Sequence, residues 1–430
     1  MESPTLRTLV APGFALFLGL TLALPAQAVS AQPAAQATSQ EAAARAFASQ
    51  ILAAFTKRDP TAIDRLIDWE AILTTALPDS FLERRGYDRA ARAEFLRGAR
   101  NTFRPGLYKP RGFAARLMAD AASMRVLRVR SVDGNPRVLL RSTGDQNGLL
   151  YLDFDLRVRD GRLRAVDIFL PHTKSYFSAV MRELFEPLIP IRFSLFSRLL
   201  GSKDTAKEDL RRAGALVDAL RTGKHQKVLE LYAALPPRSR NKAAMLVRIQ
   251  AAAEVGDPEY VAALTAFRRS FPDDPTADFL ACDLHFMKGN YARALETVDR
   301  VDAALGGDPF LDTYRANLTL ALGKPKQAHA LALAAHRSDR TLEDPLHALV
   351  TIAATTQDHV AAVRWLDALV KLANPDVDAL LADESFAAFR ASGPYERWRQ
   401  QRAREAAAKT ERKGETRTKA QGKGKNEEGE

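Results

Sequence analysis

Three aspartates on neighbouring predicted strands are the residues whose types and spacing could do acid–base chemistry. Asp153 and Asp155 alternate with apolar residues in one strand, so both side chains point to the same face, and Asp167 lies on the next strand. Carboxylates that share a face can raise the pKa of one member and create a general base. His172, after Pro171 at a strand end, is the fourth acid–base candidate.

A structural role for these aspartates is the alternative, and we favour it. Charge pairs between neighbouring strands are common on sheet surfaces. Five arginines lie on the same predicted strands: Arg125, Arg128, Arg141, Arg157 and Arg164. The sequence shows no metal-ligand spacing, no phosphate-cradling glycine loop and no nucleophile elbow, so we predict no enzyme, metal or cofactor. The single cysteine, Cys282, is expected in the core, and it excludes an intramolecular disulfide.

The elements that must position the aspartates are four strands separated by turn residues. The strands are predicted over 124–132, 137–142, 149–159 and 162–170. Asp133-Gly134 and Asp160-Gly161 between alternating runs indicate hairpins. Along the third strand, apolar and polar residues alternate, so one face is expected to meet helices and the other a pocket or water.

Helical spacing precedes the strands, over 41–56, 60–67 and 95–103, the last ending before Pro105-Gly106. Helices followed by an antiparallel meander, over 41–174, resemble the nuclear-transport-factor-2-like or polyketide-cyclase-like cone. The resemblance implies an α+β domain with helices packed on a curved antiparallel sheet that leaves a pocket. That family includes both small isomerases and catalytically silent binding modules, so the fold alone does not choose between them.

The second half of the chain repeats a helix-ending residue at a nearly fixed period. Gly223, Gly256, Gly289, Gly323 and Gln357 are 33, 33, 34 and 34 residues apart. A period of this size is typical of stacked helical hairpins. Glycine permits the left-handed turn that ends a helix. Prolines that stop a helix are expected after each second helix: Pro236, Pro272, Pro309, Pro345 and Pro375.

Five residues after the later markers, a small residue recurs at Ala294, Ala328 and Ala362, where close helix packing is expected. The run GNYARALETV, beginning at Gly289, resembles the tetratricopeptide repeat, although the first two units carry Val228 and Val261 at the small position. The resemblance implies an all-α solenoid of about five hairpins over 205–375. A related helical-hairpin solenoid is the rival interpretation. Helices over 376–402 are expected to cap it with four aromatic residues: Phe386, Phe389, Tyr395 and Trp398.

In such a solenoid the first helix of each pair lines the concave groove. A mixed polar and aromatic lining suits an extended peptide or a partner helix. Counting along the first helices predicts seven groove residues: Gln250, Phe279, Asp283, Phe286, Asn317, His347 and Thr351.

The first 28 residues have the pattern of an export signal. An apolar run over 15–24 precedes Ala26-Gln27-Ala28, a small-x-small cleavage pattern. We therefore expect a periplasmic or secreted chain, cleaved near Ala28, with a flexible lead over 29–40. The formal net charge is +11, but export argues against nucleic acid as the partner. The polar segment 403–430 is expected to be a disordered tail.

Residues 175–204 are predicted to be amphipathic connecting helices. The stretch 175–200 is apolar with interspersed arginines, which allows peripheral membrane contact. We favour a joint that covers the open end of the solenoid. The sequence as a whole predicts an exported, non-enzymatic scaffold or adaptor of the bacterial cell envelope that holds a protein or peptide partner in its groove. The alternative is a small-ligand binding protein or enzyme with its site in the N-terminal domain.

Overall fold

The computed structural model describes residues 34–109, 112–144, 149–171, 173–186, 189 and 202–405. The predicted export signal, His172 and nearly all of the predicted tail lie outside these residues. The described chain divides after Gly306 into two compact units, an N-terminal unit of residues 34–306 and a C-terminal unit of residues 307–405. No helix among the described residues is both long enough and apolar enough to cross a membrane.

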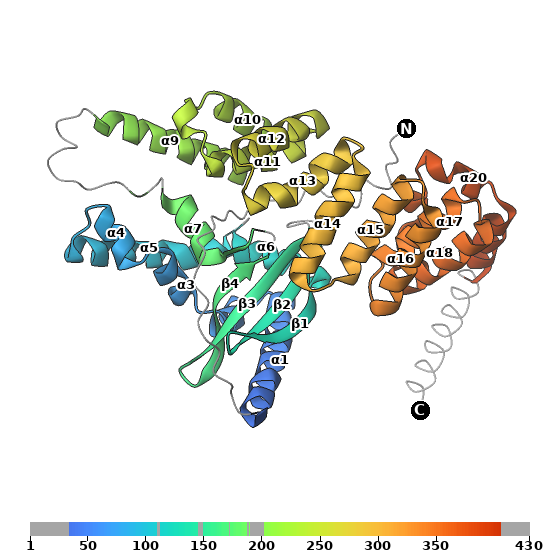
Figure 1. The fold of residues 1–430 in the computed structure, drawn as a ribbon, viewed down its shortest axis with the longest axis horizontal. Coiled ribbons are helices and arrows are strands. Elements are labelled where there is room, and N and C mark those ends of the chain that lie inside the picture. The colour runs from blue at the N-terminus through green and yellow to red at the C-terminus, as the bar shows by residue number, and fades with distance from the viewer. Residues whose placement is uncertain are drawn as a thin grey trace, which may run out of the picture. The chain divides into compact units, whose positions relative to one another are not determined.

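The N-terminal unit contains one antiparallel sheet of five strands, each paired with the next along the chain (Figure 1). The strands are β1 (Arg125–Val132), β2 (Asn135–Ser142), β3 (Leu150–Arg159), β4 (Arg162–Leu170) and β5 (Ser175–Tyr176). The four predicted strands are confirmed, and the short β5 was not predicted. Both Asp-Gly pairs have positive φ, at +51° and +75° for Asp133-Gly134 and +50° and +71° for Asp160-Gly161. These angles fit the tight turns that match the twist of antiparallel strands.

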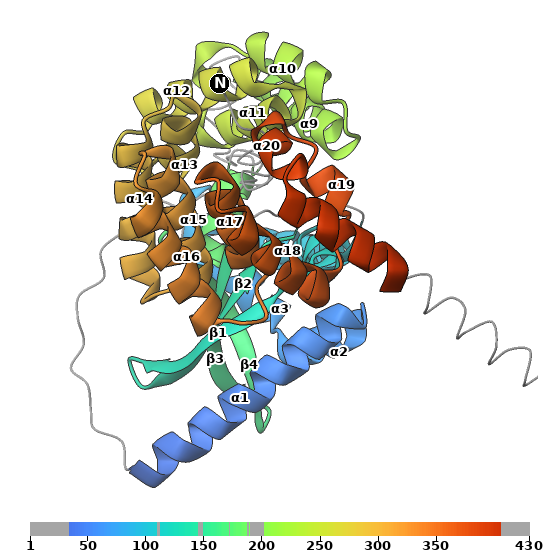
Figure 2. The ribbon, with the colours of Figure 1, turned by 90° about the vertical axis from the view of Figure 1, so that its right-hand side faces the viewer.

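Helices cover one face of this sheet. The helix α1 (Ala34–Thr56) packs against β1, β2 and β4 (Figure 2), and its Phe47 ring lies 5.8 Å from the Phe154 ring of β3. Five further helices follow before the strands: α2 (Pro60–Leu66), α3 (Trp69–Ala76), α4 (Asp79–Arg84), α5 (Arg89–Tyr108) and α6 (Phe113–Ala119).

The structure differs from the sequence predictions for this region in three respects. The helix α1 begins at Ala34, inside the predicted flexible lead, and the short helices α3, α4 and α6 were not predicted. The helix α5 does not end before Pro105 but continues to Tyr108. Its last turn is held by tertiary contacts, because Leu107 is buried and the Tyr108 hydroxyl donates to Asp64 Oδ1 at 2.7 Å.

The second face of the sheet is not open to water along β3. Tyr151, Asp153 and Asp155 are as buried as their apolar neighbours, so both faces of this strand are covered up to Leu156. Buried charges need partners, and the arginines of neighbouring strands supply them, as described below.

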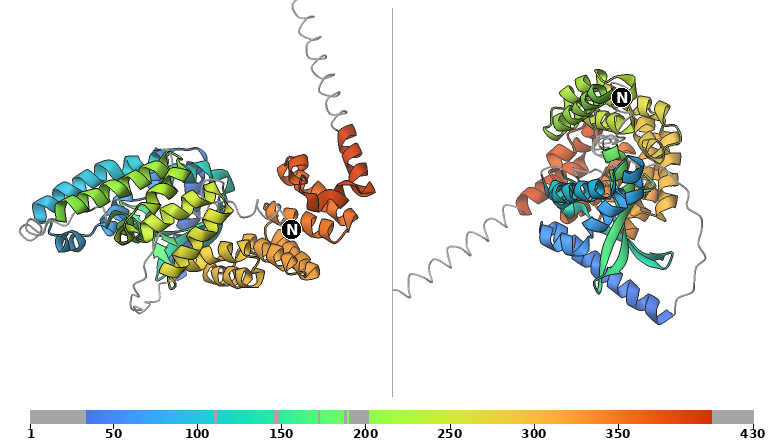
Figure 3. Two further views of the ribbon diagram at one scale, coloured as in Figure 1. Left: turned by 90° about the horizontal axis from the view of Figure 1, so that it is seen from above. Right: turned by 90° about the vertical axis from the view of Figure 1, so that its left-hand side faces the viewer.

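Consecutive packed helices follow in both units (Figures 1 and 3). The connecting segment contributes α7 (Phe177–Phe185). The N-terminal unit then has α9 (Ser202–Arg221), α10 (His225–Ala233), α11 (Lys242–Val255), α12 (Asp257–Ser270), α13 (Pro275–Met287) and α14 (Tyr291–Leu305). The C-terminal unit has α15 (Pro309–Ala321), α16 (Pro325–Ser338), α17 (Asp344–Thr355), α18 (His359–Ala373), α19 (Val377–Leu380) and α20 (Ala387–Arg390), and residues 393–405 are helical.

Four of the five repeated markers make the same turn. Gly223, Gly289, Gly323 and Gln357 have φ of +73°, +69°, +74° and +60°. At each one, the marker N–H donates to the carbonyl three residues back, and the next N–H donates to the carbonyl five residues before it. These paired bonds end a helix in the left-handed conformation.

Gly256 does not follow this pattern. Its φ of +159° is close to extended, and it alone separates α11 from α12, whereas three residues separate the helices at the other four markers. The shorter link also changes the packing after the turn. Val228, Ala294, Ala328 and Ala362 are fully buried five residues after their markers, but Val261 is only half-buried.

Two of the prolines expected to stop a second helix instead begin the next helix. Pro309 is the first residue of α15, and Pro345 lies in the first turn of α17. The first turn tolerates proline because its N–H groups have no partner within the helix. At the end of the C-terminal unit, Phe386, Phe389 and Tyr395 are buried against α18 and Trp398 packs beside them.

Candidate functional site

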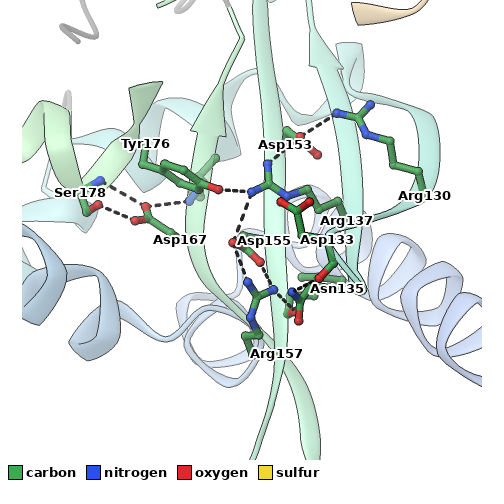
Figure 4. Close-up of polar contacts among 12 residues, drawn as sticks. Arg130, Asp133, Asn135, Arg137, Asp153, Asp155, Arg157, Asp167, Tyr176 and Ser178 are labelled. Atoms are coloured by element: carbon green, nitrogen blue, oxygen red, sulfur yellow. Dashed lines mark hydrogen bonds and ion pairs between the residues drawn. The ribbon is translucent and has the colours of Figure 1, made fainter. Parts of the chain in front are cut away.

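Two of the predicted aspartates, Asp153 and Asp155, lie in a buried charge network centred on Arg137 of β2 (Figure 4). The Arg137 side chain is almost fully buried. Its Nη1 donates to Asp153 Oδ2 at 3.1 Å, and its Nη2 donates to Asp155 Oδ2 at 3.3 Å and to the Tyr176 hydroxyl. The guanidinium also lies over the rings of Phe169 and Tyr176, at 5.7 and 5.3 Å. One cation therefore links β2 to β3, β4 and β5.

Each of the two β3 aspartates meets a second arginine. Arg130 Nη2 donates to Asp153 Oδ2 at 2.8 Å, and Arg157 forms an ion pair with Asp155. Burial nevertheless raises the pKa of Asp153, because the loss of hydration outweighs the opposing effect of the two arginines. Each of these two carboxylates is therefore held by two cations, while Asp153 Oδ1 has no hydrogen-bond partner among the described residues.

Asp167 on β4 is held differently, without an arginine. It accepts hydrogen bonds from the Ser178 hydroxyl, from the Ser178 N–H at 3.2 Å and from the Ile168 N–H at 2.8 Å (Figure 4). Burial raises the pKa of Asp167 to about 6, and these three donors oppose the rise.

The sheet register brings the predicted residues together in part. Asp155 and Asp167 are paired directly across β3 and β4, so these two side chains lie on the same face of the sheet. Of the five arginines proposed as partners, Arg157 binds one of the predicted aspartates in the contacts above, while Arg164 lies 3.7 Å from Asp68.

The sequence reasoning missed Arg130 and Arg137, although a signal for them was present. A two-residue turn at Asp133-Gly134 places Arg130 opposite Arg137, which is the observed pairing. The separate register of β2 on β3, which this turn does not fix, places Arg137 opposite Asp155.

Another arginine of the sheet binds the end of a helix. Arg128 of β1 donates from Nη1 to the Leu305 carbonyl and from Nη2 to the Gly306 carbonyl, at the C-terminal end of α14. Gly306 has φ of +81°, and a Cβ atom there would collide with the Arg128 guanidinium. A cation at a helix C-terminus satisfies carbonyls that have no partner within the helix.

The described part of the connecting segment packs within the N-terminal unit. Phe177 and Val180 of α7 are fully buried, and α7 contacts α3 and β4. Lys242 of α11 lies 2.6 Å from Asp274 Oδ2 and 3.6 Å from Glu183 Oε2 of α7, so a buried cation also links α7 to the helix pairs. Half of the stretch considered for membrane contact, residues 187, 188 and 190–200, lies outside the described residues.

The seven predicted groove residues fall into a half-buried group and a buried group. Gln250, Phe286, His347 and Thr351 are half-buried on α11, α13 and α17. Phe279, Asp283 and Asn317 are buried. Three of the seven therefore have little surface available to a partner.

Asp283 is the most buried of these residues. It accepts a hydrogen bond from the Tyr260 hydroxyl of α12 at 2.8 Å, while its Oδ1 atom has no hydrogen-bond partner in the described structure. Burial raises the pKa of Asp283 to about 7.

The described residues contain no group of three or more histidine, cysteine, aspartate or glutamate side chains that could hold a metal ion. Cys282 is half-buried, its Sγ lies 3.9 Å from the Ala294 carbonyl oxygen, and burial raises the pKa of its thiol. A raised thiol pKa lowers the fraction of nucleophilic thiolate.

Comparisons with models of known protein families, with curated proteins and with solved structures found no match.

Proposed function

We propose that the chain is an exported, non-enzymatic scaffold or adaptor of the bacterial cell envelope. In this proposal the consecutive helix pairs form a tetratricopeptide-like solenoid whose first helices hold a protein or peptide partner. The supporting observation is the shared turn at Gly223, Gly289, Gly323 and Gln357, with the same two hydrogen bonds and a buried small or β-branched residue five positions later. Repetition of one turn and one close contact is the local feature expected of stacked hairpins.

The sheet supports the non-enzymatic part of the proposal. Asp153 and Asp155 are each bound by two arginines, and Asp167 by three hydrogen-bond donors, so each of the three carboxylates has partners within the fold. A general base needs a lone pair directed at a substrate proton.

Site-specific photo-crosslinking in the native envelope tests the proposal. The crosslinking amino acid replaces Gln250 on α11 or Thr351 on α17, both half-buried positions on first helices. Matched controls carry it at Glu259 on α12 or Val360 on α18, exposed positions on the second helices of the same pairs. We expect adducts with one envelope protein from the first two positions and none from the controls. Absence of adducts, or equal adducts from all four positions, would contradict the proposal.

A second candidate function is small-ligand binding or catalysis in the N-terminal domain. Two separate observations favour it: the raised pKa of Asp167, and an open hollow of about 620 Å³ between α1, α2 and β4. Asp167 does not line this hollow, whose lining combines five alanines with three cations, Lys57, Arg65 and Arg162. Ala53→Trp would fill this hollow from an exposed position of α1. Small apolar acids that bind the wild-type chain but not this variant, as measured by saturation-transfer NMR, would support the second candidate.

A further inference from the structure

Four cations from three consecutive helices surround one hollow of about 350 Å³ in the N-terminal unit. Arg268 and Arg269 come from the last turn of α12, Lys288 follows α13, and Arg293 lies in the first turn of α14. Among the described residues, the lining contains no aspartate or glutamate, and none of these four cations forms an ion pair. Like charges held together without counter-charges repel one another, and a bound anion would remove that cost.

A buried histidine in the same lining has a donor without an acceptor. His285 is 7% exposed, and its Nε2 lies 2.9 Å from Arg268 Nη1. Arginine can only donate, so Nε2 must accept, and in the neutral ring Nδ1 then carries the proton. That Nδ1 atom is buried and has no hydrogen-bond partner among the described residues. A buried donor left unpaired costs free energy that an anionic ligand could recover.

The pKa of His285 also indicates a positive electrostatic potential in the hollow. Burial lowers the pKa of His285, and the nearby charges of Arg268, Arg293, Lys288 and Arg300 lower it further. Cations that oppose protonation of an imidazole would equally favour an anion beside it.

The beginning of α14 adds backbone donors to the same place. Asn290 lines the hollow and precedes the first residue of α14, its side chain makes no capping hydrogen bond, and no acidic residue lies in the first turn. The first N–H groups of a helix lack partners within the helix and carry partial positive charge. Anions bind at such helix beginnings, and here the surrounding guanidinium groups supply the charge.

From this geometry we propose that the hollow between α12, α13 and the beginning of α14 is a binding site for a multiply charged oxyanion of the phosphate type. Arg269 and Arg293 provide planar guanidinium groups that suit two oxygens of one phosphate, and Lys288 provides a point charge. A volume of about 350 Å³ is at the lower end of small-molecule sites, which suits one or two phosphate groups with a small organic part. The same chemistry occurs in a soluble phosphorylated compound and in a phospholipid headgroup. The proposed oxyanion site does not depend on the proposed scaffold function. Failure of the binding experiments below would leave the scaffold proposal standing, and failure of the crosslinking experiment would leave the oxyanion site standing.

Isothermal titration calorimetry of the full chain with inorganic pyrophosphate tests this site. We expect saturable binding to one site. The double variant Arg269→Gln/Arg293→Gln should weaken it by about tenfold or more, since each change removes a hydrogen bond to a charged group. The control Lys326→Gln/Arg337→Gln removes the same charge from exposed positions of α16 and should change the dissociation constant by less than about twofold.

A vesicle arm distinguishes the two sources of the oxyanion. If a phospholipid headgroup is the ligand, the chain sediments with phosphatidylglycerol vesicles, pyrophosphate releases it and the Arg269/Arg293 variant does not sediment. If the ligand is a soluble compound, the chain binds pyrophosphate but does not sediment with the vesicles. Binding to neither probe, or equal weakening by the control variant, overturns the proposal.

The wild-type chain gives a readout that needs no substitution in the site. Pyrophosphate should shift the imidazole NMR resonances of His285 and leave those of His359, on α18, unchanged. A titration in which both histidines shift together would show non-specific binding and would also overturn the proposal. Circular dichroism of the double variants confirms that they fold.

Discussion

Asp153 on β3 and Asp283 on α13 are almost equally buried, at 0% and 1% exposure, but they have different partners. Asp153 lies between Arg130 and Arg137, whereas Asp283 has one hydrogen bond from Tyr260 and no cation among the described residues. A buried carboxylate can remain charged only when cations or several donors replace water. The sheet therefore gives two of its buried acids, Asp153 and Asp155, arginine partners. The helix pairs bury Asp283 without a cation, and burial raises its pKa to about 7.

The difference follows from how each element presents its residues. Successive side chains of a strand point to opposite faces of the sheet, and residues paired on adjacent strands point to the same face. Arg137 therefore lies opposite Asp155 and diagonally beside Asp153. On α13 the hydroxyl of Tyr260, from α12, is the hydrogen-bond donor that reaches Asp283 in the described structure. We therefore expect loss of an arginine to damage the sheet at every pH near neutrality, and loss of Asp283 to act mainly at high pH.

The largest effect is expected from Arg137→Met. This change leaves Asp153 and Asp155 buried with one arginine each and removes the contact to Tyr176, so we expect a loss of about 3–5 kcal/mol in the stability of the sheet. Hydrogen exchange of the β2 and β3 amides measures it, because exchange reports each region separately in a chain of two units.

Arg157→Met is the matched control for that experiment. The Arg157 side chain is 36% exposed and binds Asp155, which keeps Arg137 as a second partner. A loss of about 1 kcal/mol is expected. Equal losses from the two variants would show that Arg137 has no central role in the network.

Asp283→Asn should have the next largest effect on stability, and it should stabilise the protein where Arg137→Met destabilises it. The pKa of Asp283 is 3.8 unfolded and about 7 folded, so the unfolded chain loses the proton first as pH rises. The folded state therefore loses stability between pH 4 and pH 7, and the penalty is complete above pH 7. The amide keeps the acceptor for Tyr260, so the variant should be more stable at pH 8 by about 2–3 kcal/mol and nearly equal at pH 4. Unfolding midpoints at both values of pH measure this change.

Asp367→Asn controls for the sign of that pH effect. A hydrogen bond from Lys371 is the main reason why the pKa of Asp367 lies below its usual value. Its contribution is present above the unfolded pKa and disappears as pH falls, so this variant should be less stable at pH 8 and unchanged at low pH. If both variants were destabilised at pH 8, burial without a cation could not be the reason for the raised pKa of Asp283.

The sequence predicted those features that depend on neighbours along the chain. The four long strands follow from alternation and from two Asp-Gly turns, and the period of the later helices follows from the markers between Gly223 and Gln357. The markers are local signals because each turn is closed by hydrogen bonds within six residues.

The features that were missed depend on contacts between distant residues. The last turn of α5 continues past Pro105 because Leu107 is buried and Tyr108 reaches Asp64, 44 residues earlier. The burial of Asp283 depends on how α12 packs beside α13, which residue spacing does not specify. The four cations of the proposed oxyanion site come from three helices, and no short motif joins them.

Ser178→Ala tests the intermediate case, Asp167, which is buried with donors but without a cation. Loss of the hydroxyl removes one of three hydrogen bonds to the carboxylate, so we expect a loss of about 1–2 kcal/mol at pH 8. The hydroxyl bond lowers the pKa of Asp167, so its removal should raise that pKa above about 6 and reduce the loss at pH 4. Hydrogen exchange of the β4 amides measures both values.

Ser49→Ala is the control for Ser178→Ala. The Ser49 hydroxyl donates to a backbone carbonyl at an exposed position of α1, so its removal should change stability by less than about 0.5 kcal/mol at either pH. A pH-independent loss from Ser178→Ala would show that its hydroxyl does not act on the charge of Asp167.

The smallest expected effect concerns the repeated turn of the helix pairs. Gln357 has the same positive φ and the same two hydrogen bonds as Gly223, Gly289 and Gly323, but its side chain is strained in the left-handed region. Gln357→Gly should therefore stabilise the C-terminal unit by about 0.5–1 kcal/mol. Thr356→Gly, one residue earlier at φ of −86°, should destabilise it by about 1 kcal/mol, because glycine there only adds freedom to the unfolded chain. Hydrogen exchange of the α17 and α18 amides measures both variants. Destabilisation by both would show that the turn at Gln357 is not equivalent to the glycine turns, and the regularity attributed to the helix pairs would end at α16.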